Sequence, residues 1–192
     1  MTFFRGFTFP LWQIFGGSLL LLLCSLFYLA WWAVSFHPHS SGGSAAAFYI
    51  AAAFITGCAA IGMMAGGINS LSEESRGLPV RYIIGGGIAL FFVLLTVTSM
   101  VFHRVVTSEL LIIHLWATLV LSAVAVLHGT GRFGAGHAVA MAALVAIFTV
   151  AALVCYVIYY DLDDTGRFYI GMAPLIADSV VMAVFLGMLA FS

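Results

Sequence analysis

Lysine is absent from this chain of 192 residues, so all six cationic residues are arginines. Without a lysine amine, the protein cannot hold retinal or pyridoxal as a Schiff base. The glycine-rich GK[ST] signature of a nucleotide-binding loop is missing for the same reason, so we expect no ATP hydrolysis. Charged residues make up only 7% of the sequence and the formal net charge is −1. No basic patch is therefore present that could hold nucleic acid.

Cysteine is scarce as well, and its positions exclude the usual cysteine motifs. The three residues are Cys24, Cys58 and Cys155, and each lies in an apolar stretch without CxxC spacing. We interpret them as small buried hydrophobic residues and expect no disulfide and no zinc motif.

Long apolar stretches dominate what is present. The mean hydropathy is +1.20, and 64% of the residues are hydrophobic. Each stretch has about 20 residues or more, enough for a helix to cross a hydrocarbon core of about 30 Å. We therefore predict an all-α integral membrane protein, a single polytopic domain over residues 1–192 with six transmembrane helices in the lipid bilayer. The predicted spans are Ile14–Phe36, Ser44–Gly67, Tyr82–Phe102, Ser108–Leu127, Ala138–Tyr160 and Phe168–Phe191.

The distribution of arginine predicts the orientation. With six spans both termini lie on one side, and that side also carries four of the arginines, while the opposite side carries Arg104 and Arg167. The positive-inside rule then places both termini in the cytoplasm. We expect a multi-pass protein of the plasma (inner) membrane.

Two similar pentapeptides suggest an internal repeat. Arg81 to Gly85 reads RYIIG at the start of the third span, and Arg167 to Gly171 reads RFYIG at the start of the sixth. A three-helix unit used twice reverses its direction in the membrane and gives an inverted repeat, as in many transporters. The hypothesis is a 3+3 inverted repeat with halves 1–103 and 104–192, although short apolar similarities also arise by chance.

Small residues in the second span predict close helix packing. Gly62 and Gly66 form a GxxxG motif, which lets two helix backbones approach each other. The motif serves packing within the bundle or, alternatively, a homo-oligomer or a partner membrane subunit.

The sixth span contains an ionisable residue where the membrane makes one costly. Asp178 lies about ten residues into the span, where insertion scales assign a charge at least about 2.5–3.5 kcal/mol. Pro174 lies one turn earlier and should kink or open the helix, because it cannot donate to the carbonyl of Ile170. Freed carbonyls and a carboxylate suit a cation or proton site. The alternative is a protonated Asp178 with a purely structural hydrogen bond.

Polar residues on the third and fourth spans predict a seam between them. His114 and Thr118 are four residues apart and share a helical face, and Thr96 and Ser99 share a face of the third span. A short connection makes the two helices antiparallel neighbours and, by counting from their ends, puts Thr96 and His114 at similar depth. His114 is the informative residue, because imidazole relays protons or binds metals near neutral pH.

The loops opposite the termini are rich in groups that attract cations. Carboxylates there predict an anionic vestibule, which histidine makes sensitive to pH, with Glu109 at its entrance. The pair His37 and His39 is a metal-site hypothesis, although H-x-H is a common pattern and loop polar residues often contact only water. The vestibule residues are Asp161, Asp163, Asp164 and His103.

Aromatic residues near the ends of the spans are interpreted as anchors at the membrane surface. Trp116 lies deeper and is the exception. The predicted anchors are Trp12, Trp31, Trp32, Tyr159, Tyr160 and Tyr169.

The leading functional hypothesis is a small channel or secondary transporter for a proton, a cation or a small polar solute, with Asp178 and His114 in its intramembrane site. One alternative is a haem- or metal-binding redox enzyme that uses histidine ligands. Another is a non-catalytic subunit of a larger membrane complex. No motif here identifies a cofactor, and an enzyme is the less favoured class.

Overall fold

The computed structural model describes residues 7–36, 43–73, 75, 80–100 and 108–191, without the side chains of Thr98 and of residues 108–111. Within these ranges it contains six α-helices and no strand. Each helix is long and apolar enough to cross a membrane, which confirms the prediction of an all-helical bundle. The helices are α1 (Phe9–Phe36), α2 (Ser44–Ser72), α3 (Val80–Met100), α4 (Ser108–Gly129), α5 (Ala135–Tyr159) and α6 (Asp164–Phe191).

Four helices, α1, α3, α5 and α6, begin earlier than hydropathy alone predicts, and the difference is largest for α1 and α6. α1 begins at Phe9 rather than Ile14, and α6 begins at Asp164 rather than Phe168. Hydropathy predicts which residues lie within the lipid. A helix can extend beyond those residues as long as its terminal backbone N–H and C=O groups find hydrogen-bond partners. Asp163 extends α6 in this way, because its Oδ1 accepts a hydrogen bond of 2.7 Å from the N–H of Gly166.

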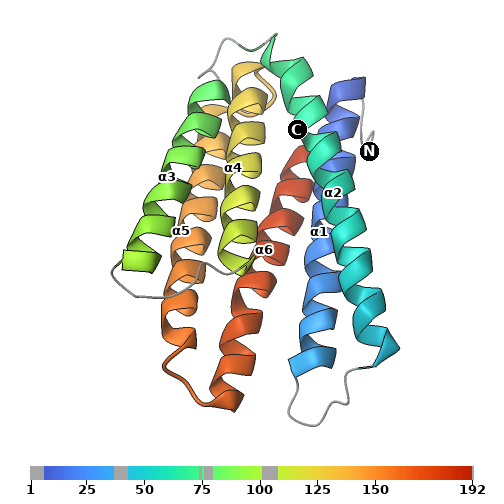
Figure 1. Ribbon diagram of the computed structural model, residues 1–192. Helices are drawn as coiled ribbons and strands as arrows, with labels where there is room; N and C mark the ends of the chain where they lie inside the picture. The colour runs from blue at the N-terminus through green and yellow to red at the C-terminus, as the bar shows by residue number, and fades with distance from the viewer. Residues whose placement is uncertain (1–6, 37–42, 74, 76–79, 101–107, 192) are drawn as a thin grey trace.

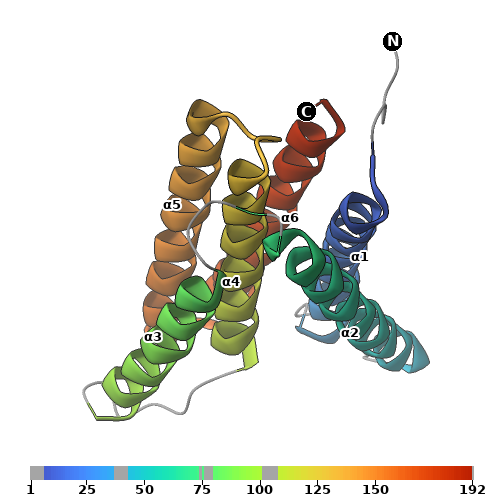
Figure 2. The ribbon, with the colours of Figure 1, turned by 90° about the horizontal axis from the view of Figure 1, so that it is seen from above.

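The six helices form a bundle in which α4 and α6 are the most buried and α3 is the least. The packed pairs are α1–α2, α1–α6, α5–α6, α4–α5, α3–α4 and α2–α4, with α1–α2 the most extensive. Figure 1 shows that α1 begins and α6 ends at the same end of the bundle, here called the terminal end. Figure 2 shows α4 in the middle, with α3 at the periphery.

The seam between α1 and α2 depends on glycine. A Cβ at Gly17 would lie 2.6 Å from the Cγ of Met64, and one at Gly67 would lie 2.7 Å from the carbonyl oxygen of Pro10. The two backbones therefore approach closely, as small residues allow. Only one glycine of the predicted GxxxG motif lies at this seam. Gly66 faces Gln13 of α1, whereas a Cβ at Gly62 would meet no neighbouring atom within 4 Å.

Buried side chains form two clusters along the bundle. The larger one lies toward the terminal end and includes Val181 and Phe185 of α6, and the smaller one lies toward the opposite end and includes Trp32 and Leu175. Asp178 lies on α6 between Leu175 and Val181, so it occupies the boundary between the two clusters.

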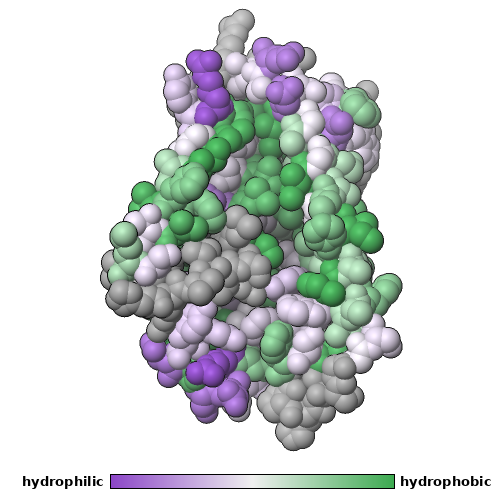
Figure 3. All heavy atoms as spheres, viewed as in Figure 1, coloured by the Kyte–Doolittle hydropathy of each residue, from purple (hydrophilic) through white to green (hydrophobic). Residues whose placement is uncertain are grey.

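The outer surface of the bundle is apolar between its ends. Figure 3 shows hydrophilic residues gathered at the two ends, with hydrophobic side chains on the surface between them. Phe54, Ile147 and Val150 are all more than half exposed on this surface. A multi-pass membrane protein requires such a surface, because lipid tails replace water around the helices.

The two similar pentapeptides lie in unlike surroundings. Gly171 packs against the indole of Trp32, whose Cη2 would lie 2.8 Å from a Cβ at this position, whereas Gly85 has open space above it. The inverted repeat and the cytoplasmic placement of the termini stay predictions.

Candidate functional site

Asp178 is the most deeply placed ionisable residue that the sequence analysis selected. Its side chain is 2% exposed, and its Oδ1 has no hydrogen-bond partner among the described residues. An ionised carboxylate in such a setting is costly unless a cation or a donor compensates it. The stable states of this group are therefore the neutral acid and a carboxylate paired with a bound cation or proton donor.

Pro174 lies one turn before Asp178 and does not interrupt the helix. α6 continues through it from Asp164 to Phe191, and the predicted kink or local opening at Pro174 stays a prediction. Proline still removes one backbone donor, which leaves the carbonyl of Ile170 without its usual helical partner N–H. Ile170 and Pro174 both line a pocket.

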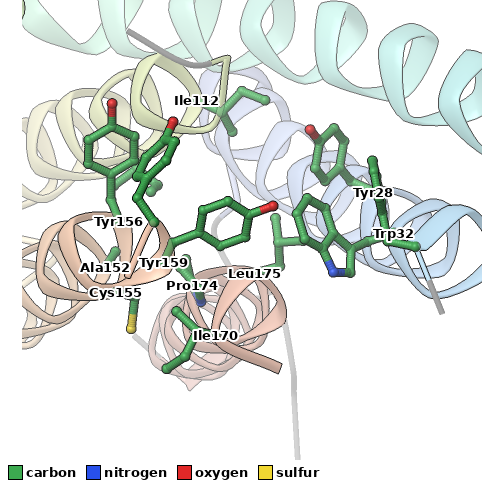
Figure 4. Close-up of a pocket in the computed structure, with 14 residues that line it drawn as sticks. Tyr28, Trp32, Ile112, Ala152, Cys155, Tyr156, Tyr159, Ile170, Pro174 and Leu175 are labelled. Atoms are coloured by element: carbon green, nitrogen blue, oxygen red, sulfur yellow. The ribbon is translucent and has the colours of Figure 1, made fainter. Parts of the chain in front are cut away.

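The pocket lies among α1, α4, α5 and α6, in the half of the bundle away from the termini. Its volume is about 260 Å³ and its lining is mainly apolar. The inner lining includes Ile113, Ala152 and Leu175. Figure 4 shows how side chains from these helices surround the space, with the ring of Tyr159 projecting toward Trp32.

Three buried polar atoms lie close along the chain to this inner lining, each on a different helix. Among the described residues, hydrogen-bond partners are absent for Trp116 Nε1 on α4, Thr149 Oγ1 on α5 and Asp178 Oδ1 on α6. Each lies three residues from a lining residue, a spacing that keeps it on the same helical face and one turn farther toward the terminal end. The pairs are Ile113 with Trp116, Ala152 with Thr149, and Leu175 with Asp178. The three polar atoms therefore lie one helical turn beyond the inner lining of the pocket.

His114 lies at the contact between α3 and α4. Its Nε2 donates a hydrogen bond of 2.7 Å to the carbonyl of Gly87, and its ring lies 5.7 Å from that of Phe91. Thr118 faces Gly87 too, since a Cβ on that glycine would lie 2.8 Å from Thr118 Oγ1. The hydroxyl of Thr118 donates to the carbonyl of His114 at 2.9 Å. Among the described residues, no hydrogen bond or ion pair joins His114 to Asp178.

The predicted depth match between Thr96 and His114 is wrong. His114 meets α3 at Gly87, and residues 87 to 96 span about 13 Å of helix at 1.5 Å per residue. Counting from the helix ends fails because the last residue of α3, Met100, extends farther past this contact than the first residue of α4, Ser108. Thr96 is exposed and donates to the carbonyl of Phe92 at 2.8 Å, and Ser99 is exposed as well.

The acidic turn between α5 and α6 has a structural role as well as a charge. Asp163 caps α6, and Asp164 forms an ion pair with Arg167 at 3.5 Å. Asp164 belongs to the first turn of the helix rather than to a loop. Asp161 is exposed in the turn. The turn therefore carries three carboxylates against one guanidinium.

Several predicted residues fall outside what the structure describes. His37, His39 and His103 lie outside the described residues, and so does the side chain of Glu109. Within the described part of the chain, no three histidine, cysteine or acidic side chains gather in a metal-binding arrangement. The vestibule role of His103 and the metal site at His37 and His39 stay predictions.

Three aromatic residues of the pocket, Trp32, Tyr159 and Tyr160, were interpreted from sequence as surface anchors. For Trp32 this is wrong, because it is 5% exposed and donates from Nε1 to the carbonyl of Phe168 at 3.1 Å. Tyr159 and Tyr160 line the pocket rather than only the outer surface. The four-residue spacing of Tyr28 and Trp32 on one helical face was the available signal. Hydropathy alone could not distinguish an interior stripe from an interfacial belt.

No protein-family model, curated protein or solved structure matches this chain. The chemistry of Asp178 and of the adjoining pocket is what the molecule offers for assigning a function.

Proposed function

We propose that this chain is a small membrane transport protein that moves a proton or a small cation, with Asp178 as its intramembrane binding group. The observation that supports this proposal is the buried Oδ1 of Asp178, which has no partner among the described residues. Residues of this kind inside membrane helices mark ion pathways and proton relays, because their burial is costly for the fold alone.

The pocket supplies one side of the pathway. It lies toward the end opposite the termini, and Asp178 follows its lining residues Pro174 and Leu175 on the same face of α6. In the proposed cycle, Asp178 takes up a proton or cation reached through this pocket. It then releases the ion toward the terminal end after the helices around α6 shift.

In the proposed cycle, the helices shift at the boundary between the two core clusters. Val181, Met182 and Phe185 follow Asp178 toward the terminal end and are fully buried. Alternating access requires one closed side at a time, and in the proposed cycle these three side chains form that closed side. His114 has a supporting role in the proposal, because its hydrogen bond to Gly87 holds α3 against α4.

The test is a flux assay on purified full-length protein in liposomes. A fluorescent pH reporter inside the vesicles follows proton movement after a pH jump, and a panel of alkali cations tests coupling. We expect flux with the wild type and flux at the level of protein-free vesicles with Asp178→Asn. The matched control is Glu73→Gln, which makes the same change of carboxylate to amide at an exposed residue after α2.

Equal flux from wild type and Asp178→Asn would overturn the proposal. Asparagine preserves the shape of the aspartate side chain, so we expect Asp178→Asn to fold. Size-exclusion chromatography checks the folding of each variant. Absence of any flux from a folded wild-type protein under every gradient would count against transport and favour the subunit or cofactor hypotheses.

A further inference from the structure

The size of the pocket limits what it can bind. Pockets for drug-sized ligands occupy about 300–1,000 Å³, and this pocket of about 260 Å³ is slightly smaller. A molecule of a few heavy atoms fits such a space. Metal ions need oxygen, nitrogen or sulfur ligands around them, and a mainly apolar lining does not supply a full set. The occupant that the lining suits is therefore a small organic molecule.

Six of the lining residues are aromatic, and they come from two sides of the pocket. The rings of Trp32 in α1 and Tyr159 in α5 meet edge to face, with centroids 6.2 Å apart and an interplanar angle of 67°. Aromatic faces carry negative electrostatic potential and attract organic ammonium groups, above all when several rings surround the cation. Figure 4 shows Tyr28, Trp32, Tyr156 and Tyr159 around the space. The six aromatic residues are Tyr28, Trp32, Phe36, Tyr156, Tyr159 and Tyr160.

Carboxyl groups lie beyond both ends of the pocket lining. At the inner end, Asp178 follows Leu175 on the same face of α6 and is 2% exposed. At the outer end, the turn after Tyr159 and Tyr160 carries three aspartates. The one nearby cation there is Arg167 among the described residues, and it is paired with Asp164 at 3.5 Å and donates to the carbonyl of Tyr160 at 3.4 Å. The balance of charge favours a cation and disfavours an anion.

We propose that the aromatic pocket binds a small organic cation of the quaternary or protonated amine class, with Tyr159 and Trp32 against the cationic group and Asp178 as its counter-charge. The inference rests on the proposed function, since it names the substrate class of the same intramembrane site. A cation in the pocket relieves the cost of an ionised Asp178, and the rings replace the water that the ammonium group loses.

A neutral apolar molecule is the competing occupant, because an apolar lining favours any hydrophobic ligand. The pair of probes that separates the two is choline and 3,3-dimethylbutan-1-ol. They have the same shape, and the second replaces the quaternary nitrogen by carbon. Binding is measured by isothermal titration calorimetry on the full chain in lipid nanodiscs, with the change in total tryptophan fluorescence as a second readout.

We expect saturable binding of choline that is at least about tenfold tighter than that of the neutral alcohol, a difference of about 1.4 kcal/mol. Tyr159→Leu should weaken choline binding by about threefold to thirtyfold, because a cation–π contact is lost, and Tyr159→Phe should restore most of that loss. The matched control is Tyr169→Leu, an exposed tyrosine of α6 outside the pocket lining. Its affinity for choline should equal that of the wild type.

Asp178→Asn should weaken choline binding while leaving the affinity for the neutral alcohol unchanged. Equal affinities of the two probes, or equal loss of both in Tyr159→Leu, would overturn the inference and identify the pocket as a general apolar site. Failure to bind choline in a protein that still shows Asp178-dependent proton flux would reject this inference alone. Charge-selective binding without any flux would instead reject the proposed transport and retain the binding site.

Discussion

The indole Nε1 of Trp32 in α1 donates a hydrogen bond of 3.1 Å to the backbone carbonyl of Phe168 in α6. The same indole packs on the Cα of Gly171, one turn farther along α6. This contact fixes α1 against α6 at the side of the pocket, and it needs both a donor on the ring and a residue without a side chain opposite it.

Replacing the tryptophan tests this contact. Trp32→Phe keeps an aromatic ring but removes the donor, so the carbonyl of Phe168 loses a partner. We expect a loss of stability of about 1 kcal/mol, the usual net contribution of such a hydrogen bond. Thermal unfolding in detergent, followed by circular dichroism, measures it. Trp12→Phe, at a half-exposed site on the same helix, is the comparison, and an equal loss there would mean that the bond to Phe168 contributes nothing.

Gly67 and Gly62 of α2 offer a matched pair of substitutions. Gly67→Ala would place a Cβ 2.7 Å from the carbonyl oxygen of Pro10, so the seam between α1 and α2 must open. We expect a loss of about 1–3 kcal/mol, typical of overpacking. Gly62→Ala meets no neighbour within 4 Å and should be neutral or stabilising by up to about 1 kcal/mol through helix propensity. Thermal unfolding of both variants in one detergent decides, and equal stabilities would contradict the close approach of the helices.

We expect the buried carboxyl of Asp178 to lower the free energy of unfolding of the protein. Asp178→Leu keeps the branching at Cγ and removes two polar atoms from a site that is 2% exposed. We expect the variant to be more stable by about 1–3 kcal/mol, because replacing uncompensated buried polar groups by apolar ones of similar shape is often stabilising. The hydroxyl of Ser122 is buried too, but it donates to the carbonyl of Thr118 at 2.7 Å, so Ser122→Ala should bring no such gain. A less stable Asp178→Leu would indicate that Asp178 has a structural partner.

The sequence was sufficient to predict the helices but not their neighbours. Hydropathy runs of about 20 residues predict spans well, since a bilayer allows few alternatives to a helix. The hydropathy of a span carries no information on which helices pack together. For this reason the depth match of Thr96 with His114 failed, and the bond between His114 and Gly87 was not foreseen.

The candidate site was predictable in part for a related reason. Asp178 could be selected from sequence because its cost in a membrane depends only on its depth, which the length of the span gives. The pocket beside it depends on how α1, α4, α5 and α6 meet, so its aromatic lining appeared only in three dimensions. Trp32 illustrates the difference. It lies near the end of a span, where some residues face lipid and others face the bundle, and the structure shows that it is buried in the bundle.

The most direct measurement is the flux of purified protein in liposomes with Asp178→Glu beside Asp178→Asn. Glutamate keeps an ionisable carboxyl but changes the packing, whereas asparagine keeps the shape but removes the ionisable group. If Asp178 binds the transported proton or cation, Asp178→Glu retains measurable flux and Asp178→Asn has none. Retained flux in Asp178→Asn, or a complete and equal loss in two folded variants, would contradict the assignment of Asp178 as the group that carries the ion.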